Sequence, residues 1–448
     1  MGVVNRNTGQ VQFIPLREHK LLRLCYGMLD ANGVMFSNED RERLKELEKA
    51  GMVEAFDESI PVRDDQLYRE YDNRFIASVH WSVTGGCNAR CRHCYMSAPH
   101  AAWGEFSHEK CMDIIDQMAE CGIHKVSLTG GEALIRKDFF DIVDRLCEKG
   151  IVITTLMSNG LLVNEGLLDK LEARGVKPEI NMSFDGIGCH DWLRNVKGAE
   201  ERVLNAFRLC KERGFPTGAE YCLHKGNMHA FRESMKLLDS LGCQSMKVNR
   251  LSLEGEAKGI ADYAITCEEE YEFYLDYIPH VFEDGISMQI MLSGMFMGSS
   301  TCKPVISQCR LPEDKPHDNY AICGHARNVM HITADGMIVP CTPMGMDSVR
   351  SMFPNIGQMT LKEALSDSGY MEFINTRLKD YFEKQPGCAS CEYRNRCAGG
   401  CRGKAAISGG IWERDMDSCH FFKGGYYERA KALIDGYAAG FTGRKGNE

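Results

Sequence analysis

Three cysteines lie close together in one short segment of the sequence, at Cys87, Cys91 and Cys94. Three thiolates in a tight loop can hold three irons of a [4Fe-4S] cluster, whereas most electron-transfer clusters have four cysteine ligands. The fourth iron is then open to an external ligand, which indicates catalysis. The alternative is a zinc site completed by His93, but zinc prefers four protein ligands, often as two separated pairs. The spacing therefore favours a catalytic iron–sulfur cluster.

A second set of cysteines lies in the C-terminal third of the chain. Clustered cysteines in a reducing compartment bind metal more often than they form disulfides. Two zinc sites and further iron–sulfur clusters are the alternatives for this set. Its members, with Gly336 between the first two, are Cys323, Cys341, Cys388, Cys391, Cys397, Cys401 and Cys419.

Composition excludes several classes of protein. The chain has 448 residues, 21 of them cysteine, and a formal net charge of −10, which argues against a nucleic-acid partner. Its N-terminus lacks the apolar region of a signal peptide, and no apolar run approaches the roughly 20 residues that span a bilayer. We therefore expect a cytoplasmic protein with reduced thiols and no membrane partner.

The residues that follow the first cysteine loop alternate between apolar strands and amphipathic helices, from 77 to about 257. Alternating strands and helices predict a parallel sheet with helices outside, as a partial barrel or a doubly wound sheet. In either case, chemistry belongs in the loops at the C-terminal ends of the strands. The predicted strands are 77–83, 125–128, 151–156, 179–183, 218–222 and 245–248.

Two flanking regions have different patterns. Residues 1–75 predict a small winged-helix-like unit: a strand over 8–14, two helices, the second opened by Ser37, and a short strand over 53–56. Its alternative role is a packing cap on the next domain. Residues 258–300 are expected to be a mostly helical linker. Beyond residue 300, glycine and cysteine become more frequent and the predicted elements become shorter. This indicates a small domain that needs bound metal for its stability.

The loop Cys87…Cys91…Cys94-Tyr95 resembles the cluster motif of the radical S-adenosylmethionine (radical SAM) superfamily. The resemblance implies a partial (β/α)6 TIM-like barrel in which the methionine amino and carboxylate groups of S-adenosylmethionine chelate the open iron. An electron from the cluster then cleaves the sulfonium, and the resulting 5′-deoxyadenosyl radical abstracts a substrate hydrogen. The cofactor carries this chemistry, and the protein positions it.

Segments after successive predicted strands resemble the cofactor contacts of that family. A guanidinium suits a carboxylate through its paired donors, and Ala133 stands where the family often has proline. The implied contacts are Tyr95 beside the adenine, Gly130, Gly131 and Glu132 at the methionine amino group, Ser158 and Asn159 at the ribose, and Ser183 with Arg194 at the carboxylate.

The C-terminal cysteines match the seven-cysteine pattern of the SPASM domain. The match implies that Cys388, Cys391, Cys397 and Cys419 ligate a distal auxiliary cluster, and that Cys323, Cys341 and Cys401 ligate a proximal one. His317 stands where the family often has the fourth proximal ligand, so Cys309 or an open iron is left as the alternative. The resemblance thus implies three [4Fe-4S] clusters and three units: 1–75, 76–285 and 286–435.

SPASM domains occur in radical enzymes that modify peptides and proteins, so we predict a maturase that forms a thioether or carbon–carbon crosslink in a ribosomally made peptide. Its partners would be a precursor peptide, whose leader adds as a strand to the N-terminal unit, and a reductant such as flavodoxin or ferredoxin. An anaerobic sulfatase-maturating type enzyme is disfavoured, because Thr342 replaces that family's aspartate base. Further interpretations are a peptide epimerase, a small-molecule enzyme and a non-catalytic iron–sulfur protein. Cys189 and Cys222, near predicted C-terminal strand ends, are candidate hydrogen-atom donors.

Overall fold

The computed structural model describes residues 2–4, 11–61, 71, 73, 76–100, 102–308, 317–346 and 348–441. Residues 5–10, within the first predicted strand and its turn, and Cys309 lie outside this part of the chain. Every helix within it is too short or too polar to cross a membrane.

A ten-stranded sheet with the order β10-β9-β8-β7-β6-β5-β4-β3-β11-β12 forms the centre of the protein. Strands β3 to β9 are parallel, β11 adds parallel to β3, and β10 and β12 are antiparallel edges. The predicted partial barrel is confirmed, since the six predicted strands correspond to β3 to β8. The strands are β3 (Ser78–Ser82), β4 (Lys125–Thr129), β5 (Val152–Ser158), β6 (Glu179–Ser183), β7 (Thr217–Leu223), β8 (Ser245–Arg250), β9 (Gln289–Leu292), β10 (Phe296–Gly298), β11 (Val329–Ile332) and β12 (Ile338–Val339).

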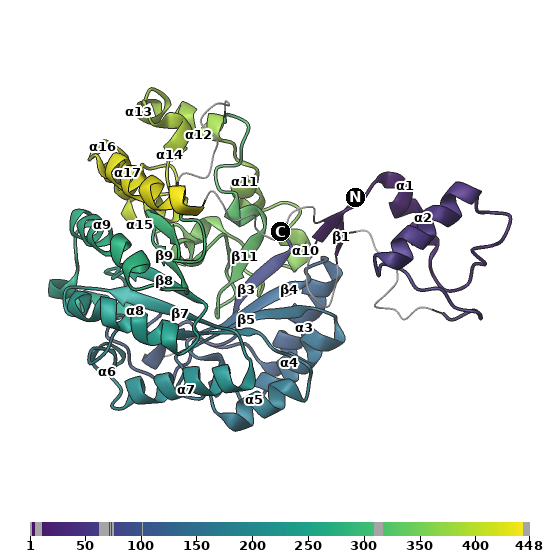
Figure 1. Ribbon diagram of the computed structural model, residues 1–448, viewed down its shortest axis with the longest axis horizontal. Helices are drawn as coiled ribbons and strands as arrows, with labels where there is room; N and C mark the ends of the chain where they lie inside the picture. The colour runs from purple at the N-terminus through teal and green to yellow at the C-terminus, as the bar shows by residue number, and fades with distance from the viewer. Residues whose placement is uncertain are drawn as a thin grey trace.

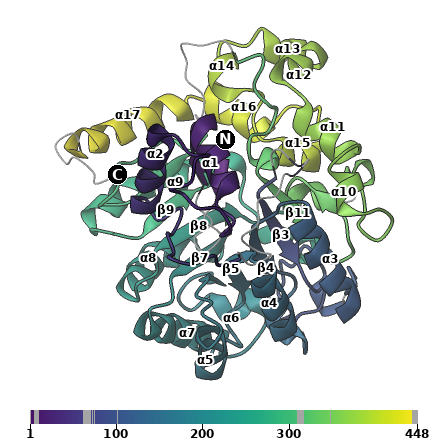
Figure 2. The same ribbon diagram turned by 90° about the vertical axis from the view of Figure 1, so that its right-hand side faces the viewer.

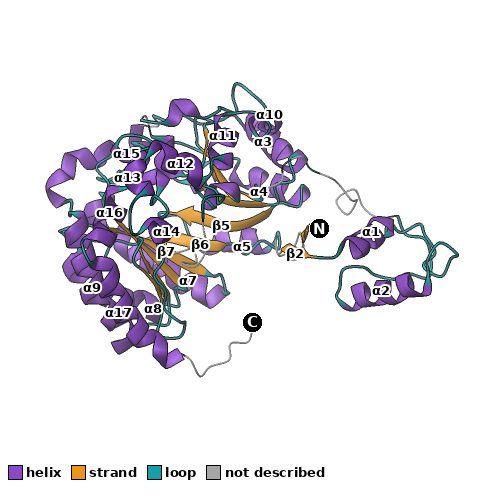
Figure 3. Cartoon of the chain, turned by 90° about the horizontal axis from the view of Figure 1, so that it is seen from above, coloured by secondary structure: helices purple, strands orange, loops and turns teal. Residues whose placement is uncertain are grey.

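Helices connect successive strands and surround the curved sheet (Figure 3). Their apolar faces pack on the sheet, as where Tyr221 of β7 meets Phe231 of α8 edge to face. Side-chain caps fix their starts: Ser107 accepts from the backbone N–H of Lys110. The connecting helices are α3 (His108–Glu120), α4 (Phe139–Glu148), α5 (Glu165–Glu172), α6 (His190–Arg194), α7 (Ala199–Arg213), α8 (Phe231–Ser240) and α9 (Cys267–Glu283).

The expected helical linker over 258–300 needs correction. It contains α9, but the chain then returns to the sheet as β9 and β10, so the sheet continues past residue 285. Ile290 and Leu292 are fully buried in the main core. A strand of four residues is too short for its alternation to stand out beside a 17-residue helix.

The N-terminal unit stands apart from the barrel in Figure 1. An antiparallel hairpin, β1 (Gly2–Val4) and β2 (Val11–Phe13), precedes α1 (Leu16–Leu24) and α2 (Asn38–Lys49). Ser37 and Asp40 form the capping box that opens α2. Leu21, Phe36 and Leu47 make a small core separate from the main one. The strand predicted over 53–56 is wrong, because that segment is a loop without a β partner.

The C-terminal region has short elements, as predicted, but it is not separate from the barrel, because β11 and β12 join the same sheet before the chain continues as short helices. Helices α16 and α17 lie beside α9 (Figures 1 and 2), where Tyr426 contacts Tyr271. The helices are α10 (Leu361–Ala364), α11 (Gly369–Asn375), α12 (Leu378–Lys384), α13 (Pro386–Ala389), α14 (Arg394–Cys397), α15 (Arg402–Ser408), α16 (Met416–Lys423) and α17 (Tyr426–Ala438).

Candidate active site and metal centres

The three-cysteine loop follows β3, and each of its thiols has a donor beside it. The backbone N–H of Ala89 donates to Cys87 Sγ at 3.4 Å, that of Ala98 donates to Cys94 Sγ at 3.3 Å, and Arg194 Nη1 lies 3.7 Å from Cys91 Sγ. Such donors stabilise thiolates, the form that ligates metal.

The chemistry of these thiols fits a cluster better than a single ion. Burial raises the pKa of Cys87 to about 11, so a bound cation is needed to hold this thiol ionised at neutral pH. Among the residues that the structure describes, no three His, Cys, Asp or Glu side chains converge closely enough to hold one metal ion. A four-iron cluster places each thiolate on a different iron, so its ligands need not converge. The zinc alternative would require Cys87, Cys91, Cys94 and His93 to meet at one point.

Gly130 and Gly131 let the loop after β4 lie against the cysteine loop. The backbone N–H groups of Gly131 and Glu132 donate to the carbonyls of Thr84 and Gly86 at 2.8 and 2.9 Å. A Cβ on Gly131 would lie 2.1 Å from the Gly86 oxygen, and Gly130 has a φ of +152°. The sequence predicted a close approach of backbone to ligand; the close approach that the structure contains is between two loops.

The Glu132 carboxylate joins the loop after β4 to the loop after β5. It accepts from Ser158 Oγ at 3.0 Å and from the backbone N–H groups of Asn159 and Leu134 at 2.8 and 3.2 Å. Burial raises its pKa to about 6, although these hydrogen bonds oppose the shift. Asn159 Nδ2 also donates to Asn88 Oδ1 in the cysteine loop at 2.7 Å. Three predicted cofactor loops are therefore tied into one unit.

Arg194 reaches the cysteine loop from the end of α6, held by a carboxylate that sequence reasoning did not assign. Its Nε and Nη2 donate to the two oxygens of Asp185 at 2.7 and 3.2 Å. Asp185 is fully buried and also accepts from the Cys222 backbone N–H at 3.0 Å. Burial alone would raise the pKa of Asp185, but Arg194 and His190 outweigh it and hold the pKa far below its usual range. The available signal was the position of Asp185, two residues after β6.

The other predicted cofactor residues lie at the same end of the sheet. Tyr95 follows Cys94 directly and meets Trp103 edge to face, with ring centroids 5.9 Å apart. Ser183 ends β6 and is paired in register with Glu220 of β7. Cys222 follows on the same face of β7 as Glu220, whereas Cys189 Sγ lies 3.6 Å from the Gly226 carbonyl in a loop. Of the two candidate hydrogen donors, Cys222 is thus next to Asp185.

The predicted distal ligands Cys388, Cys391, Cys397 and Cys419 line one cavity. Arg394, Arg414 and Lys423 line it too, and three cations suit a centre whose four thiolates carry negative charge. Burial, then the neighbouring Asp415, Cys419 and Cys388, raise the pKa of Cys397 to about 12. This donor set fits a four-thiolate cluster.

The predicted proximal ligands also lie near one another. Burial raises the pKa of Cys341, and Cys401 and Cys323 raise it further, which places their charges close by. A Cβ on Gly403 would lie 3.2 Å from Cys341 Sγ, so α15 packs tightly on this thiol. Thr342 stands where sulfatase-maturating type enzymes are expected to have an aspartate base. Its hydroxyl lies 3.4 Å from His331 Nδ1.

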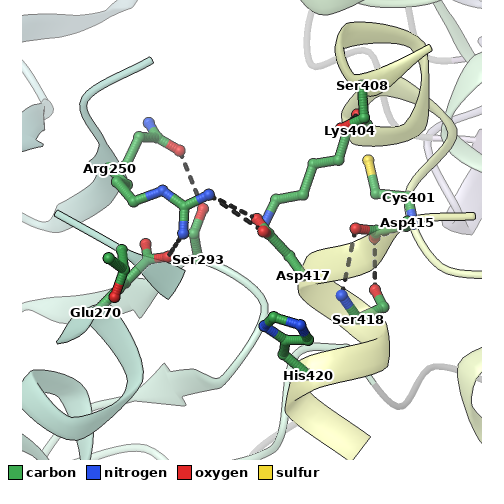
Figure 4. Close-up of polar contacts among 12 residues, drawn as sticks. Arg250, Glu270, Ser293, Cys401, Lys404, Ser408, Asp415, Asp417, Ser418 and His420 are labelled. Atoms are coloured by element: carbon green, nitrogen blue, oxygen red, sulfur yellow. Dashed lines mark hydrogen bonds and ion pairs between the residues drawn. The ribbon is translucent and has the colours of Figure 1, made fainter. Parts of the chain in front are cut away.

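A network of charged side chains joins the barrel to both auxiliary sites (Figure 4). Arg250, at the end of β8, donates to Glu270 of α9 at 3.1 Å and to Asp417 of α16 at 3.0 Å. Lys404 of α15 lies 2.9 Å from the same Asp417 carboxylate. Two residues earlier, Asp415 caps α16 and accepts from the Cys401 backbone N–H at 2.8 Å. These contacts therefore fix the positions of Cys401 and Cys419 relative to each other. The sequence missed this joint, whose partners lie 167 positions apart.

Comparisons with known proteins agree with this geometry. The profile of the radical SAM superfamily matches residues 81–238, and that of the SPASM iron-sulfur cluster-binding domain matches residues 323–392. An AdoMet-dependent heme synthase of Nitratidesulfovibrio vulgaris is 26% identical over 77% of this chain and 92% of its own length. A PqqA peptide cyclase of Granulibacter bethesdensis is 25% identical over 75% of this chain and 83% of its own.

A solved structure has the same fold over almost the whole chain. Streptococcus suis SuiB bound to its precursor peptide SuiA superposes with a TM-score of 0.63 at 14% identity, covering 93% of this chain and 95% of that one. The two profile matches show that the chain is an enzyme with a radical SAM domain over residues 81–238 and a C-terminal SPASM iron–sulfur domain over residues 323–392.

Proposed function

We propose that this enzyme forms a thioether or carbon–carbon crosslink in a ribosomally made precursor peptide. When bound, S-adenosylmethionine and its cluster supply the 5′-deoxyadenosyl radical that removes a substrate hydrogen. The residues of this chain orient the cofactor: Tyr95 at the adenine, the loop Gly130-Gly131-Glu132 at the amino group, Ser158 and Asn159 at the ribose, and Ser183 and Arg194 at the carboxylate.

The proposal includes three [4Fe-4S] clusters within three units, 1–75, 76–285 and 286–435. Cys87, Cys91 and Cys94 would hold the catalytic cluster, and a flavodoxin- or ferredoxin-type protein would supply its electron. The other two sets are Cys323, Cys341 and Cys401 for the proximal cluster, and Cys388, Cys391, Cys397 and Cys419 for the distal one.

The structure of the N-terminal unit is the observation that supports a peptide substrate. Among the described strands, β1 and β2 pair only with each other, so each offers an edge to which a peptide strand can add. The unit also leaves large apolar side chains exposed: Phe13 is 83% exposed, and Val34 and Met35 are exposed as well. An open sheet edge and exposed apolar side chains in one unit suit a peptide that binds by main-chain and side-chain contacts. SuiB, which aligns over 93% of this chain, has been solved with a precursor peptide.

The decisive experiment uses a variant that lacks residues 1–61 and a candidate precursor peptide, to be sought as a short cysteine-containing reading frame beside the gene. Tyr71 and Asn73 stay, because Asn73 Nδ2 donates to the Ile76 and Cys121 carbonyls and anchors the start of the barrel. We expect the variant to keep its clusters and its substrate-free cofactor cleavage, and to lose peptide affinity and turnover. Modification of the full-length peptide with unchanged kinetics would refute the role of the unit.

Point variants make the same test without truncation. Val34→Ser and Met35→Ser should weaken peptide binding, whereas Met352→Ser, at a half-exposed apolar position outside the unit, should not. Isothermal titration of the peptide against each protein measures the difference. Equal losses for all three variants would mean that the effect is not specific to the N-terminal unit.

A tetrapyrrole substrate is the second candidate, because the AdoMet-dependent heme synthase matches this chain over nearly its own full length. Incubating the reduced enzyme with S-adenosylmethionine and either the peptide or an iron coproporphyrin separates the two functions. A mass change in the porphyrin alone would replace the peptide proposal. A third candidate is peptide epimerisation. It predicts that a product formed in deuterated water contains deuterium from the solvent, and that the Cys222→Ala variant no longer incorporates this deuterium.

A further inference from the structure

The inner face of the parallel sheet is polar, which is unusual for strands covered by helices. Parallel strands packed on both faces normally carry apolar residues throughout. In β6 to β8 the outward side chains are apolar and buried, as Tyr221 against α8 shows. The alternate side chains point to the opposite face. These inner residues are Asn181, Ser183, Glu220, Cys222, Lys247 and Asn249.

Glu220 and Lys247 form an ion pair on this face. They are paired in register on β7 and β8, and Lys247 Nζ lies 3.8 Å from Glu220 Oε1. Asn249 Nδ2 donates to Glu220 Oε2 at 2.9 Å, and Ser293 Oγ donates to Asn249 Oδ1 at 3.0 Å. Both carboxylate oxygens of Glu220 are therefore engaged, and its position is fixed.

Lys247, in contrast, has donors to spare. Its ammonium group carries three N–H donors, and Glu220 is its one ion-pair partner within the described part of the chain. Its side chain is 48% exposed, against 27% for Glu220. A lysine that is half exposed, fixed on one side by a carboxylate and open on the other suits an incoming anion.

The pair lies between the cofactor site and the proximal cysteines. On one side, Ser183 is in register with Glu220, and the backbone of Cys222 donates to Asp185, the partner of Arg194. On the other side, His80 and His331 stack with ring centroids 4.1 Å apart, and Thr342, next to Cys341, contacts His331. The charge of Lys247 acts on both histidines, and burial lowers the pKa of His80 to about 4, so that ring is neutral at pH 7. Lys247 is thus the cation of this part of the inner face.

We propose that Lys247, positioned by Glu220, binds a carboxylate of the substrate on the inner face of the sheet, between the cofactor site and the proximal cysteines. This inference rests on the proposed function, because it concerns the substrate of the same site. In a peptide the carboxylate belongs to an aspartate or glutamate near the modified residue. In a porphyrin it belongs to a propionate.

The test compares acidic and neutralised substrates on matched variants. The substrates are the precursor peptide with each Asp or Glu changed in turn to its amide, and iron coproporphyrin beside its methyl ester. The proteins are wild type, Lys247→Gln, Lys247→Arg and the control Lys236→Gln, whose lysine pairs with Glu233 on the exposed side of α8. Substrate-free 5′-deoxyadenosine formation checks that cofactor chemistry is intact in each.

Wild type should lose about 10- to 100-fold in kcat/KM when one particular carboxylate is neutralised. Lys247→Gln should lose the same factor on the acidic substrate and no longer discriminate, while Lys247→Arg and Lys236→Gln keep the preference. Full discrimination by Lys247→Gln, or indifference of wild type to every carboxylate, would overturn the inference. If the peptide is unmodified and only the porphyrin shows the Lys247-dependent preference, the peptide function fails and the carboxylate site stands.

Discussion

The catalytic cysteines and the auxiliary cysteines are supported in different ways. Cys87, Cys91 and Cys94 follow β3, an internal strand of the ten-stranded sheet, and direct hydrogen bonds join their loop to the neighbouring loops. The distal cysteines lie on or beside α13, α14 and α16, helices of four to eight residues. Helices this short have little stability of their own. The polypeptide itself therefore shapes the catalytic site, whereas we expect the auxiliary region to depend more on what its cysteines bind.

The largest expected effect concerns the catalytic loop. Replacing Cys87, Cys91 and Cys94 together by alanine should reduce 5′-deoxyadenosine formation to background, because the loop can no longer hold the cluster that contains the open iron. Iron should fall from about 12 to about 8 per chain, since the auxiliary sets are untouched. Thermal unfolding of the barrel should change little. A collapse of the barrel in this variant would show that the catalytic loop also depends on its metal, and the contrast between the two regions would disappear.

The second-largest expected effect is a difference in hydrogen exchange between the two regions after iron is removed. Metal-binding free energy is folding free energy where the site does not preform. After anaerobic chelation, hydrogen exchange should speed up by at least tenfold over residues 386–424 and stay nearly unchanged in β4 to β7. Mass spectrometry of peptic fragments measures both at once. Uniform protection across the two regions would contradict the comparison.

The joint between the regions should respond to a smaller change. Arg250→Ala leaves the buried Glu270 carboxylate without its cation, while Asp417 keeps Lys404, and breaking a buried pair costs about 3–5 kcal/mol. The matched control is Arg429→Ala, which removes an exposed pair with Glu272 worth about 0–1 kcal/mol. Denaturant unfolding of the loaded enzymes, with retention of auxiliary iron, tests the pair. Equal stability of the two variants would show that Arg250 does not anchor the C-terminal region.

The smallest expected effect is a pH dependence in the catalytic region. Because burial raises the pKa of Glu132 to about 6, the folded protein holds this proton more tightly than the unfolded chain does. Its contribution to stability is therefore present at low pH and lost as pH rises from about 4.5 to 6, by about 2 kcal/mol. Glu132→Gln should remove this slope, whereas Glu212→Gln on exposed α7 should keep it. A wild-type slope in Glu132→Gln would assign the dependence to another group.

The same contrast explains how far the sequence could predict the molecule. β6 agrees with its predicted bounds, 179–183, because its alternating apolar residues mark it. The cluster cysteines stood out because their spacing is local. Asp185 and Arg250 did not stand out in the sequence. Asp185 depends on its burial and Arg250 on its distant partners Glu270 and Asp417, and a local sequence pattern shows neither property. Likewise, the strand predicted over 53–56 had suitable residues but finds no neighbouring strand among the residues that the structure describes.

Strand β11 has a consequence for how the enzyme is made. It pairs with β3, the strand that leads into the catalytic cysteines, across roughly 250 positions of sequence. During synthesis, one edge of β3 stays uncovered until the ribosome has released residues 329–332. An uncovered strand edge is a template for aggregation, and pairing at long range is slow. A chain cut before β11 would lose more than its auxiliary cysteines, because the strand beneath its catalytic loop would keep an open edge.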